Sequence, residues 1–159
     1  MSVSSASMTF TFDTSEAVEY FTKMAFRMVA YEPVFEKLKI AVRTGNVSNF
    51  ASQGSLYGGW APLTPYTVED RIKHGFGGPA PILVRDGFLM DSLVTLDGPP
   101  NDIGPESATF GTDISYAKFH QYGTLRMPKR EIMPDPMGLA PFAARLVLKQ
   151  IVPDSGIVV

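Results

Sequence analysis

Prolines and glycines divide most of this chain into short pieces. Thirteen prolines and fourteen glycines occur among its 159 residues. Proline lacks a backbone N–H donor and glycine readily enters turn conformations, so we expect several turns and loops between short elements. A chain of this length can form one domain around one sizeable core. We therefore take residues 1–159 as a single domain with extended termini at 1–7 and 152–159.

The charge content is low for a soluble domain. Apolar residues make up 45% of the chain, which argues against disorder, whereas charged residues make up only 19%. Burial against other subunits would accommodate a surface with so few charges. The formal net charge of −2 argues against a dedicated nucleic-acid binder, but not against a channel through which DNA slides.

The sequence gives little indication of disulfides or membrane segments. The chain has no cysteine, which excludes disulfides and thiolate metal sites and fits assembly in a cytoplasm. Its first twenty residues lack the basic start and unbroken apolar run of a signal peptide. No window approaches the roughly 20 apolar residues of a membrane span, so we expect no membrane partner.

The apolar pattern predicts helices near the N-terminus. Residues 8–12 alternate polar and aromatic side chains, as a short strand does. Asp13, Thr14 and Ser15 can then cap a helix. Apolar residues recur at helical spacing on both sides of Pro33, whose ring disfavours helix at the preceding residue. We expect two consecutive helices, or one kinked helix, continuing to Gly45.

The elements after Gly45 are predicted to be shorter. Residues 46–62 are rich in Gly, Ser and Asn and form a predicted loop. Thr64 or Thr67 can cap the next helix, with Pro65 at its first position if Thr64 is the cap. This helix is expected to stop at 75–78, and a strand or turn followed by helical turns is expected over 83–93. A hairpin is predicted to pair 94–96 with 107–111, followed by a helix over 114–122 that Gly123 ends. A basic loop over 125–136 and a last helix over 140–151 complete the predicted elements.

These elements predict an α+β fold. It consists of an N-terminal helical pair, a small antiparallel sheet with long loops, and a C-terminal helix.

The residue types that carry catalysis or metal binding do not form a recognisable motif. His74 and His120 are the only histidines, and neither belongs to an HxH or HExxH motif. A triad of Asp91, Ser92 and His120 can be written down, but no GxSxG elbow presents the serine. The glycine-rich run at 75–79 lacks the lysine and Ser/Thr of a phosphate loop. We assign no catalytic, metal-binding or cofactor-binding residue and expect no cofactor.

Three groups of residues are candidates for contact with a partner. Arg126, Lys129 and Arg130 form the one basic cluster, which could contact DNA phosphates or an acidic partner ring, or form an ordinary solvated loop. Trp60 and Tyr57 belong to an aromatic-rich region that either packs in the core or anchors a subunit interface. The third group is the apolar end of the chain, which could add as a strand to a neighbouring sheet edge: Ile157, Val158 and Val159.

Three ordered segments resemble the virion morphogenesis family of tailed phages, which includes Mu-like and P2-like tail completion proteins and related minor tail components. The resemblance covers roughly residues 15–150, and it rests on the combination rather than on one motif. The first segment is Phe50, Gln53, Gly54, Ser55, Gly59, Trp60, Ala61, Pro62, Leu63, Thr64 and Thr67; the second is Pro81, Ile82, Leu83, Asp86, Gly87, Leu89, Ser92 and Leu93; the third is Phe110, Gly111, Thr112, Tyr116, Ala117, His120, Gln121, Tyr122 and Gly123.

These motifs have structural readings. Tyr116, Phe119 and Tyr122 are expected to pack a short helix that Gly123 ends. The chain departs from the family before its last helix, where Asp135 stands in place of an expected arginine and Met137 in place of a common aromatic residue. The contact made by that arginine has no counterpart at this position, and Arg130 is the candidate substitute.

The resemblance implies a non-enzymatic virion protein at the head-proximal end of the tail, in the neck. Such a protein would form a homo-oligomeric ring around the DNA channel, with six copies favoured and twelve possible, assembled in the host cytoplasm. It would contact the tail tube or terminator on one side and the head-side connector (stopper or adaptor) on the other, and genomic DNA would pass through without sequence recognition. The alternatives are the tail terminator itself, a transient assembly factor absent from the mature virion, and a small hydrolase that uses His120.

Overall fold

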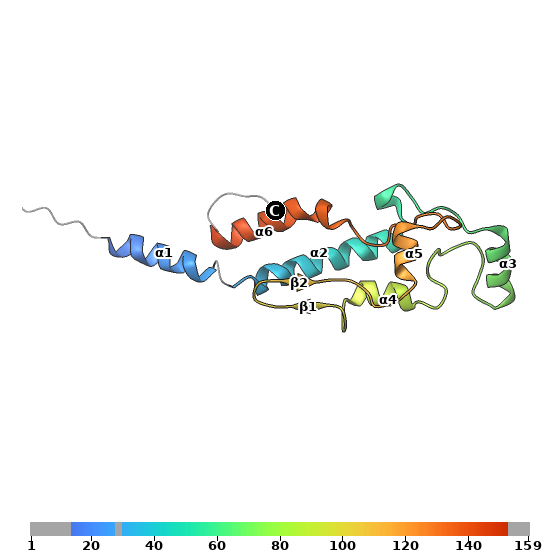
Figure 1. The fold of residues 1–159 in the computed structure, drawn as a ribbon, viewed down its shortest axis with the longest axis horizontal. Coiled ribbons are helices and arrows are strands. Elements are labelled where there is room, and N and C mark those ends of the chain that lie inside the picture. The colour runs from blue at the N-terminus through green and yellow to red at the C-terminus, as the bar shows by residue number, and fades with distance from the viewer. Residues whose placement is uncertain (1–13, 28–29, 153–159) are drawn as a thin grey trace, which may run out of the picture.

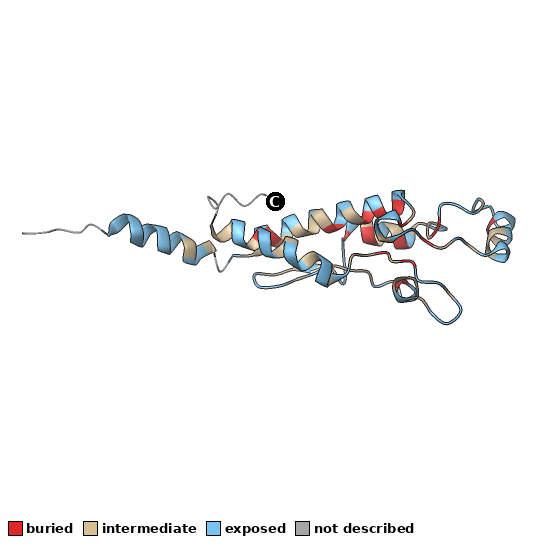
Figure 2. Cartoon of the chain, turned by 90° about the horizontal axis from the view of Figure 1, so that it is seen from above, coloured by how far each residue is buried: buried red, intermediate tan, exposed pale blue. Residues whose placement is uncertain are grey.

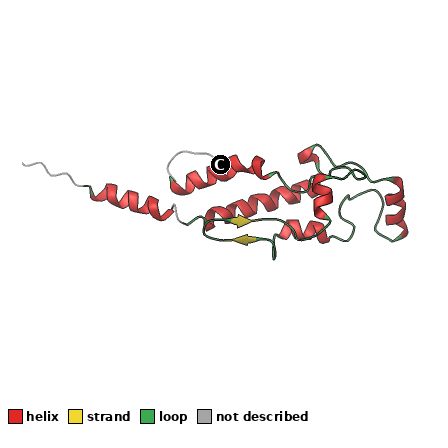
Figure 3. Ribbon diagram, in the orientation of Figure 1, coloured by secondary structure: helices red, strands yellow, loops and turns green. Residues whose placement is uncertain are grey.

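The computed structural model describes residues 14–27 and 30–152. The predicted strand at 8–12 and the apolar end Ile157, Val158 and Val159 lie outside the described residues. Within them the chain has the predicted α+β composition, mostly helical with one small antiparallel sheet (Figure 3).

The N-terminal helical pair is confirmed. Helix α1 spans Ser15–Arg27 and helix α2 spans Glu32–Ala51, so the chain forms two helices rather than one. Helix α2 carries Pro33 in its first turn, where the missing N–H costs nothing. Figure 1 shows α1 projecting from one end of the structure, while α2 runs through its middle.

Helix α2 continues past Gly45, contrary to the expectation that 46–62 is a loop. Asn46, Asn49 and Phe50 are all buried on the continuing helix. Their burial outweighs the low helix propensity of Gly45, which costs roughly 1 kcal/mol relative to alanine. The predicted loop therefore begins only after Ala51 and includes the short helix η1, Ser55–Tyr57.

Helices α4 and α6 both pack against α2. Helix α4 spans Phe88–Thr95 and begins after Gly87, and helix α6 spans Pro136–Ile151. Helix α6 begins earlier than the predicted residue 140, because the Asp135 side chain accepts a hydrogen bond from the Met137 N–H at 3.2 Å.

The small sheet is a hairpin whose first strand lies later in the chain than predicted. Strand β1, Asp102–Ile103, pairs with β2, Ala108–Thr109, in antiparallel register. The predicted pairing of 94–96 is wrong, since α4 runs through Thr95 and Leu96 follows it with a φ of 54°. The Leu93 and Leu96 side chains are fully buried, which favours the helical arrangement over an extended one.

Local start and stop signals are confirmed at two helices. Helix α3, Pro65–Lys73, is capped by Thr64, whose hydroxyl accepts from the Thr67 N–H at 3.3 Å. Helix α5, Ala117–Tyr122, ends at Gly123 with a φ of 73°. A Cβ on Gly123 would lie 2.9 Å from the Lys129 nitrogen, so glycine is required there on two counts.

The core lies where the C-terminal half of α2 meets α4 and α5. Figure 2 shows most of the buried residues there, whereas α1 is almost entirely exposed and α3 combines exposed and intermediate residues with the buried Arg71. The central cluster is Phe50, Trp60, Ile82, Leu89, Leu93, Ala117 and Ile132.

Candidate interaction surfaces

Trp60 is a core residue. Its side chain is 8% exposed, and its ring packs edge-on against Phe50 with centroids 5.2 Å apart. Its indole N–H donates to the Glu131 carbonyl at 2.8 Å. Of the two interpretations of Trp60, core packing is therefore correct. Its assignment as an interface anchor is wrong, because the indole is enclosed within the subunit. Tyr57 is partly buried, and burial, followed by the charge of Glu131, raises the pKa of its hydroxyl.

The predicted basic cluster is divided between the surface and the interior. Arg126 is exposed, and Lys129 pairs with the Glu131 carboxylate at 2.9 Å. Arg130 is only 5% exposed, and burial lowers the pKa of its guanidinium. Its Nε donates to the Ala61 carbonyl at 2.8 Å and its Nη2 to the Pro62 carbonyl at 3.0 Å. Arg130 therefore ties the tryptophan loop to the basic loop, which corrects its assignment to a partner surface.

Side-chain amides hold the same basic loop, which the sequence analysis did not anticipate. The Glu131 carbonyl also accepts from Asn49 Nδ2 at 2.9 Å. Gln121 Oε1 accepts from the N–H groups of Ile132 and Met133, and its Nε2 donates to the Met133 carbonyl. The only sequence signal was the presence of Gln121 in the third resembling segment.

No other part of the described chain covers the apolar side of helix α1. None of its residues from Ser15 to Arg27 is buried. Val18, Phe21 and Phe26 are 60%, 65% and 74% exposed, and with Thr22 and Ala25 they line a shallow apolar groove. Large apolar surfaces of this kind mark contacts with other molecules. We call this surface the α1 face.

The aromatic residues of the third segment are also exposed. Tyr116, Phe119 and Tyr122 are 44%, 46% and 80% exposed, which contradicts the expectation that they pack the short helix α5. The buried residue of this helix is Ala117.

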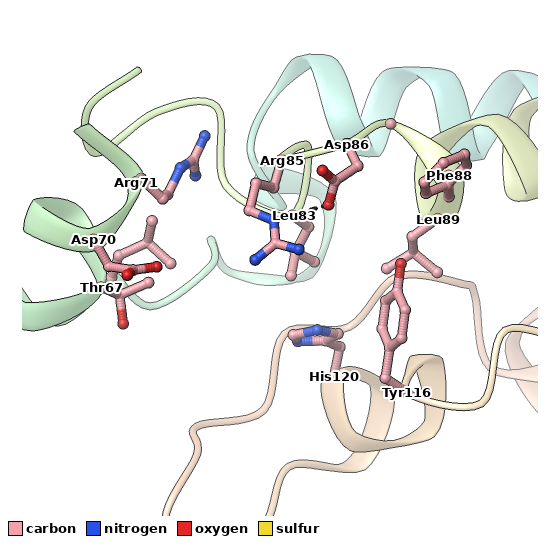
Figure 4. Close-up of a pocket in the computed structure, with 12 residues that line it drawn as sticks. Thr67, Asp70, Arg71, Leu83, Arg85, Asp86, Phe88, Leu89, Tyr116 and His120 are labelled. Carbon is pink, nitrogen blue, oxygen red and sulfur yellow. Dashed lines mark hydrogen bonds and ion pairs between the residues drawn. The ribbon is translucent and has the colours of Figure 1, made fainter. Parts of the chain in front are cut away.

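A pocket of about 500 Å³ lies between α3, α4 and α5 (Figure 4). Charged and apolar groups share its lining, and we call it the α3–α5 pocket. Its lining residues are Leu63, Thr67, Asp70, Arg71, Leu83, Arg85, Asp86, Gly87, Phe88, Leu89, Tyr116 and His120.

Arg71 and His120 of the α3–α5 pocket each have a buried nitrogen without a hydrogen-bond partner among the described residues. Arg71 is 4% exposed, and its terminal nitrogens donate to the carbonyls of Pro81 and Phe76 at 2.9 and 3.2 Å. His120 Nδ1 is buried without a hydrogen-bond partner among the described residues. Burial, followed by the charge of Arg130, lowers the pKa of His120.

Ser92 and His74 have partners within the subunit, whereas His120 Nδ1 has none among the described residues. The Ser92 hydroxyl lies 2.8 Å from the Thr112 hydroxyl and donates to the Leu89 carbonyl. His74 Nδ1 lies 2.8 Å from the Asp70 carbonyl. Among residues 14–27 and 30–152, no group of three or more His, Cys, Asp or Glu side chains is placed to hold a metal ion.

Comparisons with protein-family models, curated proteins and solved structures found no match to this chain. Within the described part of the chain, no helix combines the length and apolar character needed to cross a bilayer.

Proposed function

We propose that this chain is a non-enzymatic structural subunit of a tailed-phage virion, acting in the neck at the head-proximal end of the tail. The observation that carries the proposal is the uncovered α1 face. Val18, Phe21 and Phe26 remain mostly exposed on a helix that projects from the body (Figure 1).

Helix α1 needs a partner for physical reasons. An isolated helix of about this length is marginal in water, and most helical stability in proteins comes from packing of an apolar face. Within the described chain, α6 is the one element that makes several contacts with α1. Assembly with other copies would cover the α1 face and stabilise the helix.

A ring is the assembly that fits a neck position. Ring contacts are heterologous, so that one face of each subunit meets a different face of the next. The described chain has unlike surfaces near its two ends, with the α1 face at one and the α3–α5 pocket at the other (Figure 1). The resemblance of the three segments supports the location in the neck and the proposed copy number of six, with head-side and tail-side rings as neighbours and DNA in the channel.

Light scattering tests the proposal on the full chain, alone and with isolated tails. We expect a discrete ring, or a monomer that becomes a ring on tails. Replacing Phe21 and Phe26 together by serine should leave a monomer in both conditions. Ile40→Ser is the matched control, because Ile40 is 63% exposed on α2 and belongs to neither the α1 face nor the α3–α5 pocket. A wild-type chain that stays monomeric with tails and is missing from purified particles would contradict the proposal.

A further inference from the structure

The α3–α5 pocket contains hydrogen-bond donors that have no acceptor among the described residues. Arg85 uses its Nε to bind the Asp86 carboxylate at 2.8 Å, and its guanidinium lies 5.1 Å from the Phe76 ring centroid. Neither of its terminal nitrogens donates a hydrogen bond within the described part of the chain. Figure 4 shows the Arg85 guanidinium pointing toward His120. These terminal nitrogens form the fork that binds a carboxylate in a bidentate manner.

Two further polar groups lie beside this fork. Tyr116 lines the same pocket as Arg85, and its ring packs edge-on against His120 with centroids 6.1 Å apart. The Tyr116 hydroxyl and a His120 ring nitrogen can each donate to an acceptor. Three side chains from separate parts of the sequence thus bring donors to one pocket.

A buried guanidinium also favours an anion here. Arg71 lines the pocket but is only 4% exposed, and no described residue accepts a hydrogen bond from its Nε. No carboxylate lies within ion-pair distance of it among residues 14–27 and 30–152. A buried charge without a counter-charge is costly, so a negative ligand nearby would be stabilised.

The carboxylates of the pocket restrict what kind of anion can bind. Asp70 lies 3.3 Å from His74 Nδ1 and Asp86 is bound by Arg85, so each has a partner. Both would repel a nucleic acid, which brings several phosphates together, more strongly than a ligand that brings a single carboxylate. Leu63, Leu83 and Leu89 supply apolar walls that a phosphate backbone could not use.

We propose that the α3–α5 pocket binds an acidic peptide segment, in which one Asp or Glu side chain is flanked by apolar residues. The carboxylate binds the Arg85 fork, with Tyr116 and His120 as further donors, and the flanking side chains pack on the partly buried Leu63 and Leu83. This inference goes beyond the proposed function, because it holds whether or not the chain forms a ring.

The test is a titration of the isotope-labelled full chain, followed by NMR, with N-acetyl-Leu-Glu-Leu-amide. The matched probe is the same peptide with glutamine in place of glutamate. We expect the glutamate peptide to shift the Leu83 and Leu89 methyl signals and the Arg85 Nε–H signal, and the glutamine peptide to bind at least about tenfold more weakly.

Variants separate the pocket from general attraction to positive charge. Arg85→Gln and Tyr116→Phe should each weaken binding of the glutamate peptide, Arg85→Gln by about tenfold. Arg126→Gln removes an exposed charge outside the pocket and should change nothing. Equal binding of the two peptides, equal loss in Arg126→Gln, or tighter binding of acetate, inorganic phosphate or oligothymidine would each overturn the proposal.

Discussion

The indole N–H of Trp60 donates a hydrogen bond of 2.8 Å to the backbone carbonyl of Glu131. The same carbonyl accepts from Asn49 at the end of α2. The tryptophan loop, the long helix and the basic loop therefore meet at one oxygen atom. Because Arg130 ties the basic loop to the carbonyls of Ala61 and Pro62 as well, two long connections form part of the structural framework.

Replacing Trp60 should destabilise the subunit itself. Trp60→Ala removes a buried aromatic side chain and is expected to lower the free energy of unfolding by roughly 3–5 kcal/mol. Trp60→Phe keeps most of the packing but leaves the Glu131 carbonyl with one donor fewer, so its loss should be smaller. Urea unfolding followed by circular dichroism measures both. An unchanged unfolding midpoint, with loss confined to oligomerisation, would contradict the core position of Trp60.

Gly54 should tolerate no side chain, because Trp60 occupies the space. A Cβ at Gly54 would lie 2.2 Å from Trp60 Cδ1, and Gly54 also has a φ of +84°. Gly54→Ala is expected to cost clearly more than the roughly 1–2 kcal/mol of the left-handed conformation alone. Gly58 is the matched control, since its φ is +89° and nothing lies within 4 Å of its Cβ position. Equal losses of unfolding free energy in Gly54→Ala and Gly58→Ala would show that the predicted clash is absent.

Features set by neighbouring residues could be predicted from the sequence. The cap at Thr64 and the helix end at Gly123 each depend on a local signal, and the structure has both, whereas the interruption predicted at Pro33 lies before Glu32, the first residue of α2. Such signals act through backbone sterics and hydrogen bonds within a few residues. The α+β composition could therefore be predicted as well.

Features set by distant contacts could not be predicted in this way. Helix α2 continues beyond Gly45 because Asn46 and Asn49 bind the carbonyls of Leu93 and Glu131, far along the chain. Arg130 was grouped with Arg126 and Lys129 on sequence spacing alone, although only tertiary structure decides which of them is buried. Tertiary structure likewise decides that Ala117 of α5, rather than its aromatic residues, is buried.

Arg130 and Arg126 should differ in their effect on stability. Arg130→Ala leaves the Ala61 and Pro62 carbonyls without their donor and is expected to lower the free energy of unfolding by roughly 1–3 kcal/mol. Arg126→Ala removes an exposed side chain, so its unfolding midpoint should stay close to that of the parent chain. Thermal and urea unfolding of the two variants make the comparison. Equal midpoints for both variants would return Arg130 to the solvated basic cluster.

The last prediction concerns acid and His120. Burial, followed by the charge of Arg130, lowers the pKa of His120 in the folded chain. The unfolded chain therefore takes up this proton at a higher pH than the folded chain does. The free energy of unfolding should then fall as pH decreases from the unfolded-chain pKa of about 6.5 toward the lower pKa of the folded chain.

Urea midpoints measured between about pH 7.5 and pH 5 should show this decline in the parent chain and a shallower one in His120→Gln. His74→Gln is the control, because His74 is largely exposed at its side chain and lies outside the buried contact with Arg130. If His120→Gln keeps the parent slope, another group causes the acid sensitivity and the buried position of the His120 ring is not its origin.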